Sequence, residues 1–111
     1  RQHFVSPKSR PMEGARAYTD SEIEVQFSEI AGWSFHDGAI ERTYAFRDYH
    51  DTIAFVNALA WMVHSEDHHP DLQVGYNRCA VRWNTHSVGG VSENDFVCAA
   101  KSDAVFARAL G

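Results

Sequence analysis

Three segments of this 111-residue chain carry apolar residues at the spacing of an amphipathic helix. They run from Thr19 to Gly32, from Asp48 to about His68, and from Ser92 onward. Thr19, Asp48 and Ser92 can each cap a helix N-terminus, because their side-chain oxygens accept hydrogen bonds from the free amides of the first turn. Gly32 is predicted to end the first helix. Pro70 ends the second, because it disfavours the helical conformation of the residue before it.

Between these helices the apolar positions alternate with a period of two, as they do in β-strands. Residues 33–36 and 40–47 form an alternating pair around Asp37-Gly38, a dipeptide typical of two-residue hairpin turns. Residues 72–84 also have the pattern of a strand, either long or split by a break at 75–77. The predicted order is therefore α-β-β-α-β-β-α. We expect an α+β fold in which three helices pack on one face of an antiparallel four-stranded sheet.

The length and composition favour one folded domain preceded by a short arm. Residues 1–18 contain Pro7, Pro11 and Gly14 and show no apolar period, so we expect an irregular N-terminal arm there. Residues 19–111 are then long enough for a single domain with one hydrophobic core. The composition is 44% hydrophobic and 23% charged, which is ordinary for a globular protein and unlike a disordered chain.

Charge and hydropathy argue against several classes of partner. Lys and Arg number 10 against 15 Asp and Glu, and the formal net charge of −5 gives no basic surface for nucleic acid. No run approaches the ~18 apolar residues of a membrane span, and the start lacks the apolar core of a secretion signal. Cys79 and Cys98 are too few for a disulfide framework. We therefore expect a cytoplasmic protein without membrane contact.

The candidate chemistry is concentrated in residues 64–70, which hold three of the seven histidines. Imidazole can both give and take a proton near neutral pH. The residues alone leave three interpretations: a metal site on the His64–His68 face of the helix, a polar helix end that meets the terminal carbonyls, or acid/base catalysis. A metal site is disfavoured, because the segment lacks the His-Glu-x-x-His pattern and Pro70 takes His69 out of the helical register. Catalysis needs a further group from elsewhere in the chain.

Later residues extend this segment into a pattern that resembles the pterin-4a-carbinolamine dehydratase family. The pattern is His64-x-x-x-His68-His69-Pro70, then Tyr76-Asn77, then Thr85-His86, then Gly90-Val91-Ser92 and Asp95. Gly32-Trp33 and the stretch 46–49 are also similar to the family, so the resemblance runs from about Trp33 through the last helix. Two positions depart from it. His64 stands where the family often has a carboxylate, and Leu72 stands where many relatives have Trp.

The resemblance implies an enzyme that dehydrates 4a-hydroxytetrahydrobiopterin to quinonoid dihydrobiopterin without a metal or an organic cofactor. It implies that His68, His69 and His86 are catalytic. The substrate-binding residues that it implies are Asp67, His68, His69, Asn84, Thr85, His86, Ser87 and, with the departure noted above, His64. Relatives form dimers and tetramers, so it further implies a homodimer or homotetramer. An aromatic amino acid hydroxylase would be the pathway partner.

The elimination of water itself fits a pair of histidines. One proton must leave N5 of the pterin and another must reach the departing hydroxyl on C4a, so an acid and a base must lie along one edge of the ring. We expect His68 and His86 to exchange these protons, and His69, held extended by Pro70, to orient the substrate. Two alternatives are a non-enzymatic dimerisation cofactor or scaffold, and a protein that binds another pterin.

The remaining histidines and the tryptophans are expected to be structural. No direct role is expected for His3, His36 and His50. A place in the core or in an interface is expected for Trp33, Trp61 and Trp83, because large aromatic side chains mostly serve packing. Asp95 is expected to act as a helix N-terminal charge and as a cap-box partner of Ser92.

Overall fold

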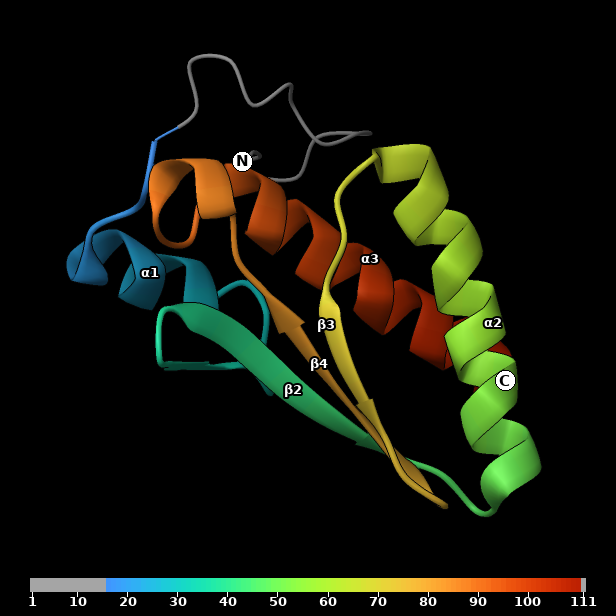
Figure 1. Cartoon of the computed structure of the whole chain (residues 1–111). Helices are drawn as coiled ribbons and strands as arrows, with labels where there is room; N and C mark the ends of the chain where they lie inside the picture. Colours follow the sequence, from blue (N-terminus) through green and yellow to red (C-terminus); the bar gives the residue numbers. More distant parts are fainter. Residues whose placement is uncertain (1–15, 111) are drawn as a thin grey trace.

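The computed structural model describes residues 16–110 and has the predicted α+β architecture (Figure 1). Its elements are α1 (Asp20–Phe27), β1 (Ser34–His36), β2 (Ala39–Ala45), α2 (Tyr49–Glu66), β3 (Asp71–Val74), β4 (Arg78–Trp83), the 3₁₀ helix η1 (His86–Val88) and α3 (Glu93–Leu110). The predicted order is therefore confirmed. Most of the predicted arm, including His3, lies outside the described residues.

The four strands form one antiparallel sheet in the order β1-β2-β4-β3. In the central pair, Ile40 lies opposite Trp83 and Ala45 lies opposite Arg78. β3 begins beside the Trp83 end of β4 and runs toward the Arg78 end. The sheet therefore has two distinct ends. α2 starts near the Ala45 end and returns to the Trp83 end, where α3 begins (Figure 1).

The core lies between one face of the sheet and the helices α2 and α3. Its largest fully buried side chains on these elements are Trp83, Tyr44, Phe55, Phe96, Ile40, Leu59 and Val81. α1 joins this core through buried Ile23, and Phe27 packs edge-on against Phe96 with ring centroids 6.0 Å apart. The opposite face of the sheet carries exposed Thr43 and Arg78. None of the helices in the described part combines the length and hydropathy needed to cross a membrane.

α1 is shorter than predicted: it ends at Phe27, whereas the sequence predicted a helix that continues to Gly32. The predicted capping box of Thr19 and Glu22 is present at its start. At its end, the Glu29 amide donates to the Gln26 carbonyl, which is a three-residue turn and not a continued α-helix. The apolar spacing of α1 extends past its end, because Ile30 is buried in the core although it lies in the turn after the helix.

β2 also ends earlier than predicted, at Ala45 and not at Arg47. The Phe46 amide still donates to the Asn77 carbonyl, but Asp48 already caps α2 by accepting from the Asp51 amide. Of the two forms predicted for 72–84, the split form is confirmed. The Gly75 amide donates to the Arg78 carbonyl at 2.8 Å and closes the turn that separates β3 from β4.

Candidate active site

The C-terminal end of α2 places His68 beside the N-terminal end of α3. α2 ends at Glu66, and Asp67 adopts a left-handed conformation with φ 54° that turns the chain out of the helix. Glu66 is buried, and its carboxylate accepts a hydrogen bond from Lys101 of α3 at 2.6 Å. This ion pair fixes the end of α2 against α3, so the position of His68 depends on both helices.

His68 is held by one hydrogen bond and one ring contact. Its Nε2 lies 2.7 Å from Oδ1 of Asp95, and its ring stacks on Trp83 with centroids 5.4 Å apart and an interplanar angle of 19°. The His68 side chain is only 10% exposed. Trp83 is itself fully buried at the end of β4. The imidazole therefore rests on a rigid surface of the core, and its orientation is set by Asp95.

Asp95 is fully buried and joins three parts of the chain. Its Oδ2 accepts from Thr85 Oγ1 at 2.7 Å and from the Ser92 amide at 2.9 Å, while Oδ1 meets His68. The Thr85 amide in turn donates to the Gly90 carbonyl, which closes the loop around η1. The segments 67–69 and 84–87 therefore meet at the first turn of α3.

The hydrogen-bond network assigns the tautomer of His68. An aspartate carboxylate can only accept hydrogen bonds, so the imidazole donates from Nε2. The lone pair of a neutral ring then lies on Nδ1, which Asp95 does not engage. A histidine held in this way can take a proton at Nδ1, and the neighbouring carboxylate stabilises the imidazolium that forms. The arrangement is suited to general acid/base chemistry.

The other predicted site residues surround this cluster without joining it. His86 directly follows Thr85, and His69 directly follows His68. Exposed positions are occupied by His64, Asp67, His69, His86 and Ser87, whereas Asn84 is half-buried. Among residues 16–110, no hydrogen bond or ion pair links His64, His69 or His86 to Asp95. Of the predicted site residues, the structure thus brings together His68 and Thr85, which both donate hydrogen bonds to the Asp95 carboxylate.

Asp95 and Trp83 were assigned only structural roles from the sequence. Both roles are confirmed, since Asp95 accepts from the Ser92 amide as a cap-box partner and Trp83 is in the core. Their contacts with His68 were missed. A signal for Asp95 was present, because it lies at the fixed spacing of the family pattern. No sequence signal indicated that Trp83 would lie under the imidazole.

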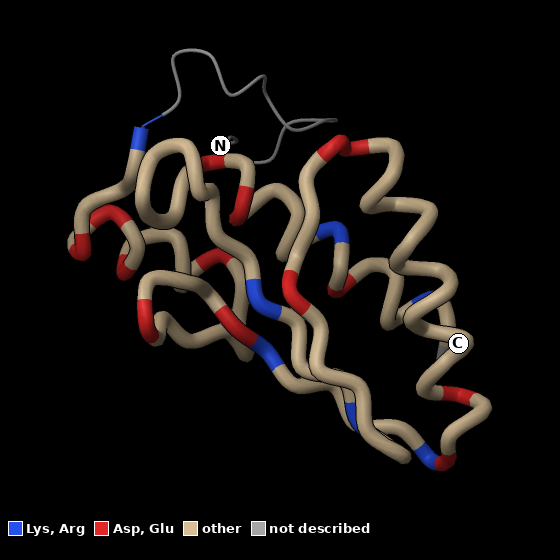
Figure 2. Tube along the Cα trace, viewed as in Figure 1, with Lys and Arg blue, Asp and Glu red and all other residues tan. Residues whose placement is uncertain are grey.

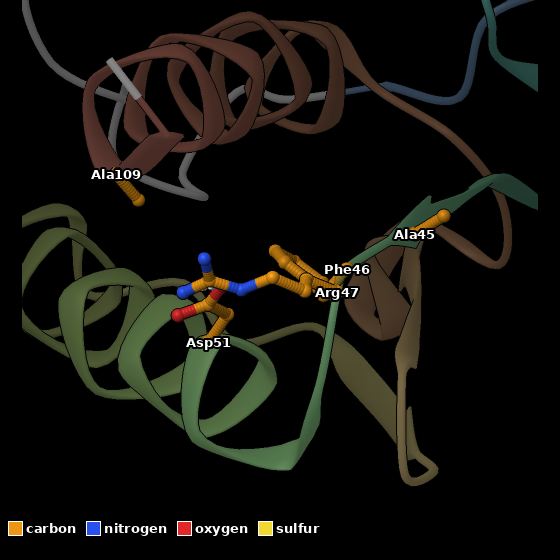
Figure 3. A pocket seen from close by; sticks show the side chains of 5 residues that line it. All are labelled: Ala45, Phe46, Arg47, Asp51 and Ala109. Carbon is orange, nitrogen blue, oxygen red and sulfur yellow. Dashed lines mark ion pairs between the residues drawn. The ribbon is translucent and has the colours of Figure 1, made fainter.

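Two of the hollows on the described surface have no predicted site residue in their lining. One has a volume of about 490 Å³ and lies at the Ala45 end of the sheet, where Arg47 pairs with Asp51 at 3.2 Å (Figure 3). The other, of about 380 Å³, lies on the open face of the sheet beside Arg82 and Gln73. Both hollows are separate from the His68 cluster.

One group of potential metal ligands also lies at the Ala45 end. Donor atoms of Asp48, His50 and Asp51 lie within 4.8 Å of one another. The Asp48 carboxylate already caps α2, and the guanidinium of Arg47 lies 3.6 Å from Asp48 and 3.2 Å from Asp51. Since a cation of the chain already occupies these carboxylates, the group gives no support for a metal site.

Comparison with known proteins identifies the family of this chain. The model of the family described as pterin 4 alpha carbinolamine dehydratase matches residues 16–105. The chain belongs to this family. A relative from Nitrosospira multiformis is 48% identical over 104 residues, covering 93% of this chain and 92% of that protein. One from Bdellovibrio bacteriovorus is 52% identical over 106 residues, covering 92% and 87%. Both are provisionally named pterin-4-alpha-carbinolamine dehydratase.

Solved structures support the same fold. The crystal structure described as a transcriptional coactivator/pterin dehydratase from Brucella melitensis is 34% identical to this chain, with a TM-score of 0.77. The match covers 81% of this chain and 98% of that one. A pterin dehydratase-like protein, described as a RuBisCO assembly factor in the alpha-carboxysome, is 24% identical with a TM-score of 0.56, covering 67% and 86%. That second similarity shows the fold alone.

Proposed function

We propose that this protein is a hydro-lyase that dehydrates 4a-hydroxytetrahydrobiopterin to quinonoid dihydrobiopterin and so serves tetrahydrobiopterin recycling. The observation that carries the proposal is the His68–Asp95 pair, packed on Trp83 and next to the loop that bears His86. Family membership over residues 16–105 and the provisional names of the two relatives support the same substrate class.

The proposed reaction breaks the C4a–O bond and forms a double bond between C4a and N5. The N5 proton passes to a base, and the departing hydroxyl takes a proton from an acid and leaves as water, so no net proton is consumed. His68 is the base through Nδ1, since the carboxylate of Asp95 holds the Nε2–H and stabilises the charged ring. His86 is the acid. His69 orients the pterin.

The substrate contacts belong to the two segments that meet at Asp95. Asp67 stands beside His68 at the exposed end of α2, while Asn84 and Ser87 flank Thr85 and His86. Polar groups from both segments would then hold the edge of the pterin that carries N5 and C4a. His64 is the weakest member of this set, because its side chain lies exposed in the last turn of α2 and makes no hydrogen bond within the described residues.

Substitution of the histidines tests the mechanism. His68→Ala and His86→Ala should each lower the enzymatic rate of carbinolamine dehydration, measured above the spontaneous rate, by roughly 10²-fold or more. His36→Ala is the matched control, because His36 is exposed on β1 and, within residues 16–110, its side chain pairs with Asp37 alone. We expect it to keep the wild-type rate. Wild-type rates in both His68→Ala and His86→Ala would refute the mechanism.

A non-enzymatic scaffold role is the second candidate. It draws support from the Brucella melitensis structure, whose description includes a transcriptional coactivator, and from the general rule that one fold can host several functions. A folded wild-type protein that leaves the carbinolamine dehydration rate at its spontaneous value would favour this candidate. Binding of a pterin without any rate enhancement would instead favour a binder of another pterin.

The cellular setting completes the proposal. The carbinolamine would arise in the reaction of an aromatic amino acid hydroxylase, which is the proposed pathway partner. A cytoplasmic location and a homodimer or homotetramer are part of the same proposal. Purification of the chain as an oligomer from the cytoplasmic fraction would support both the location and the oligomeric state. Purification as a monomer would refute the proposed oligomeric state.

A further inference from the structure

The last residues of the predicted N-terminal arm lie against the loop that closes around η1. The Tyr18 amide donates a hydrogen bond to the Val91 carbonyl at 2.6 Å. Beside it, a Cβ added at Gly90 would lie 3.4 Å from the Cβ of Ala17, so the two stretches of backbone run close together. In Figure 1, the blue segment before α1 accordingly passes beside the orange loop before α3. We call residues 16–18 the tether.

The tether is anchored on both sides of this contact. The Tyr18 ring stacks on buried Phe96 of α3, with centroids 5.6 Å apart and an interplanar angle of 20°. On the other side, Thr19 caps α1, and the guanidinium of Arg16 pairs with Glu22. All the charges on α1 are acidic, as Figure 2 shows, which suits that pair. Because the pair is exposed to solvent, it contributes little, and the Tyr18 ring is the main anchor.

The loop beside the tether carries His86. It comprises residues 85–90, and its two ends pair, since the Thr85 amide donates to the Gly90 carbonyl at 2.7 Å. The His86 side chain is exposed and, within residues 16–110, makes no hydrogen bond or ion pair. The position of the imidazole therefore depends on the backbone of the loop.

The tether is the third fastening of this loop. The first is its paired ends, and the second is the Asp95 carboxylate, which accepts from Thr85 and from the Ser92 amide. The tether holds Val91, which is only 2% exposed, so its carbonyl needs a partner within the protein. The Tyr18 amide is that partner. Loss of the tether would leave a buried carbonyl unpaired where the loop joins α3, and the loop would open to let water reach it.

We infer that the tether positions His86 for the proposed dehydration, and that Tyr18 is the residue through which it does so. The inference rests on the proposed function for its effect on the rate. An acid must lie within hydrogen-bond reach of the departing hydroxyl, about 2.6–3.2 Å between heavy atoms. A displacement of about 1 Å can lower the rate roughly 10²-fold. Tyr18 acts through His86 and touches no reacting atom, so it is a positioning residue.

Substitution of the anchoring ring is the first test. Tyr18→Ala removes the ring that packs on Phe96 and should lower kcat by roughly 10-fold or more, with a smaller change in KM, because His86 acts in the chemical step. Tyr18→Phe keeps the ring and the amide and should keep the wild-type kcat. Phe27→Ala is the matched control, because Phe27 also packs on Phe96 but from α1, outside the tether and the loop. Equal kcat values for Tyr18→Ala and Phe27→Ala would overturn the inference.

A double-mutant cycle tests whether the effect passes through His86. In a His86→Ala background, Tyr18→Ala should no longer lower the dehydration rate, because the group that the tether positions is absent. A second fall of roughly 10-fold in this background would show that Tyr18 acts elsewhere, and the inference would fail. Urea denaturation of each variant separates these rate changes from loss of the folded state.

Hydrogen exchange of the Thr85 amide tests the hold on the loop without the reaction. In Tyr18→Ala this amide, which donates to the Gly90 carbonyl, should exchange roughly 10-fold or more faster than in the wild type, whereas Phe27→Ala should leave its rate unchanged. An active wild type whose Thr85 amide exchanges no faster in Tyr18→Ala overturns the inference alone. An inactive wild type with faster exchange in Tyr18→Ala refutes the proposed function and supports the hold of the tether on the loop.

Discussion

Asp95 accepts hydrogen bonds from three parts of the chain and leaves no face of its carboxylate to solvent. Two of these bonds, from Thr85 and from the Ser92 amide, hold the loop and the start of α3. The third sets the tautomer of His68. A single side chain therefore connects the geometry of the fold to the proposed chemistry. We regard it as a positioning residue, because it acts through His68.

Asp95→Asn tests this role. The amide can donate to Nε2 and so favour the other tautomer of His68, which should lower kcat by roughly 10²-fold or more. Loss of a buried acceptor should also cost about 1–3 kcal/mol of unfolding free energy. Steady-state kinetics measure the loss of kcat, and the ¹⁵N chemical shifts of the His68 ring report the change of tautomer.

Ser92→Ala is the matched control for Asp95→Asn. It removes the Ser92 hydroxyl from its contact with Thr85 but keeps the Ser92 amide and the hydrogen bond that His68 donates to Asp95. We expect lower stability with a kcat near that of the wild type. A kcat for Asp95→Asn no lower than that of Ser92→Ala, with unchanged ring shifts, would contradict the positioning role.

At the scale of elements, local chemistry decided which boundaries could be predicted. The capping box at Thr19, the cap at Asp48 and the Asp37-Gly38 turn each depend on neighbouring residues, and all three are confirmed. The predicted ends of α1 and β2 were wrong, because tertiary contacts determine where these elements end. Ile30 lies in the turn after α1 and is buried in the core. The Phe46 amide donates to the carbonyl of Asn77, which is distant in the sequence. Neither contact leaves a trace in the local pattern.

The hairpin turn gives a prediction at this scale. Gly38 has φ 77°, and a Cβ added there would meet nothing within 4 Å, so Gly38→Ala introduces backbone strain without a clash. We expect it to lower the unfolding free energy by about 1–2 kcal/mol, measured by urea denaturation. Gly75→Ala is the control, because its φ is not in the left-handed region and its Cβ would make an ordinary 3.5 Å contact with Arg78. Equal losses in both variants would refute this account.

At the scale of the molecule, the fold class could be predicted but the convergence of distant residues could not. The candidate site shows this: His68 was identified, while its contacts with Asp95 and Trp83 join positions that no local period relates. A second polar cluster went unpredicted for the same reason. Asp103 of α3 accepts from Trp33, Arg42 and Tyr44, which lie 59 to 70 residues earlier in the chain.

The Asp103 cluster ties α3 to the sheet and should make stability depend on alkaline pH. Burial, and then the hydrogen bond to Asp103, raise the pKa of Tyr44 above its ordinary value. Below pH ~10 the phenol is neutral in both the folded and the unfolded chain, and its contribution to stability is fully present. As the pH rises above ~10, the unfolded chain loses this proton and the folded chain keeps it, so stability falls.

The Tyr44 contribution should reach a slope of about 1.4 kcal/mol per pH unit in the unfolding free energy. Urea denaturation between about pH 8 and 11.5 measures the slope, and Tyr44→Phe should remove the part that belongs to this phenol. Tyr76→Phe is the matched control, because Tyr76 is 66% exposed and its loss should leave the slope unchanged. If Tyr44→Phe and the wild type lost stability in parallel above pH ~10, the raised pKa of Tyr44 would not contribute to the stability of the fold.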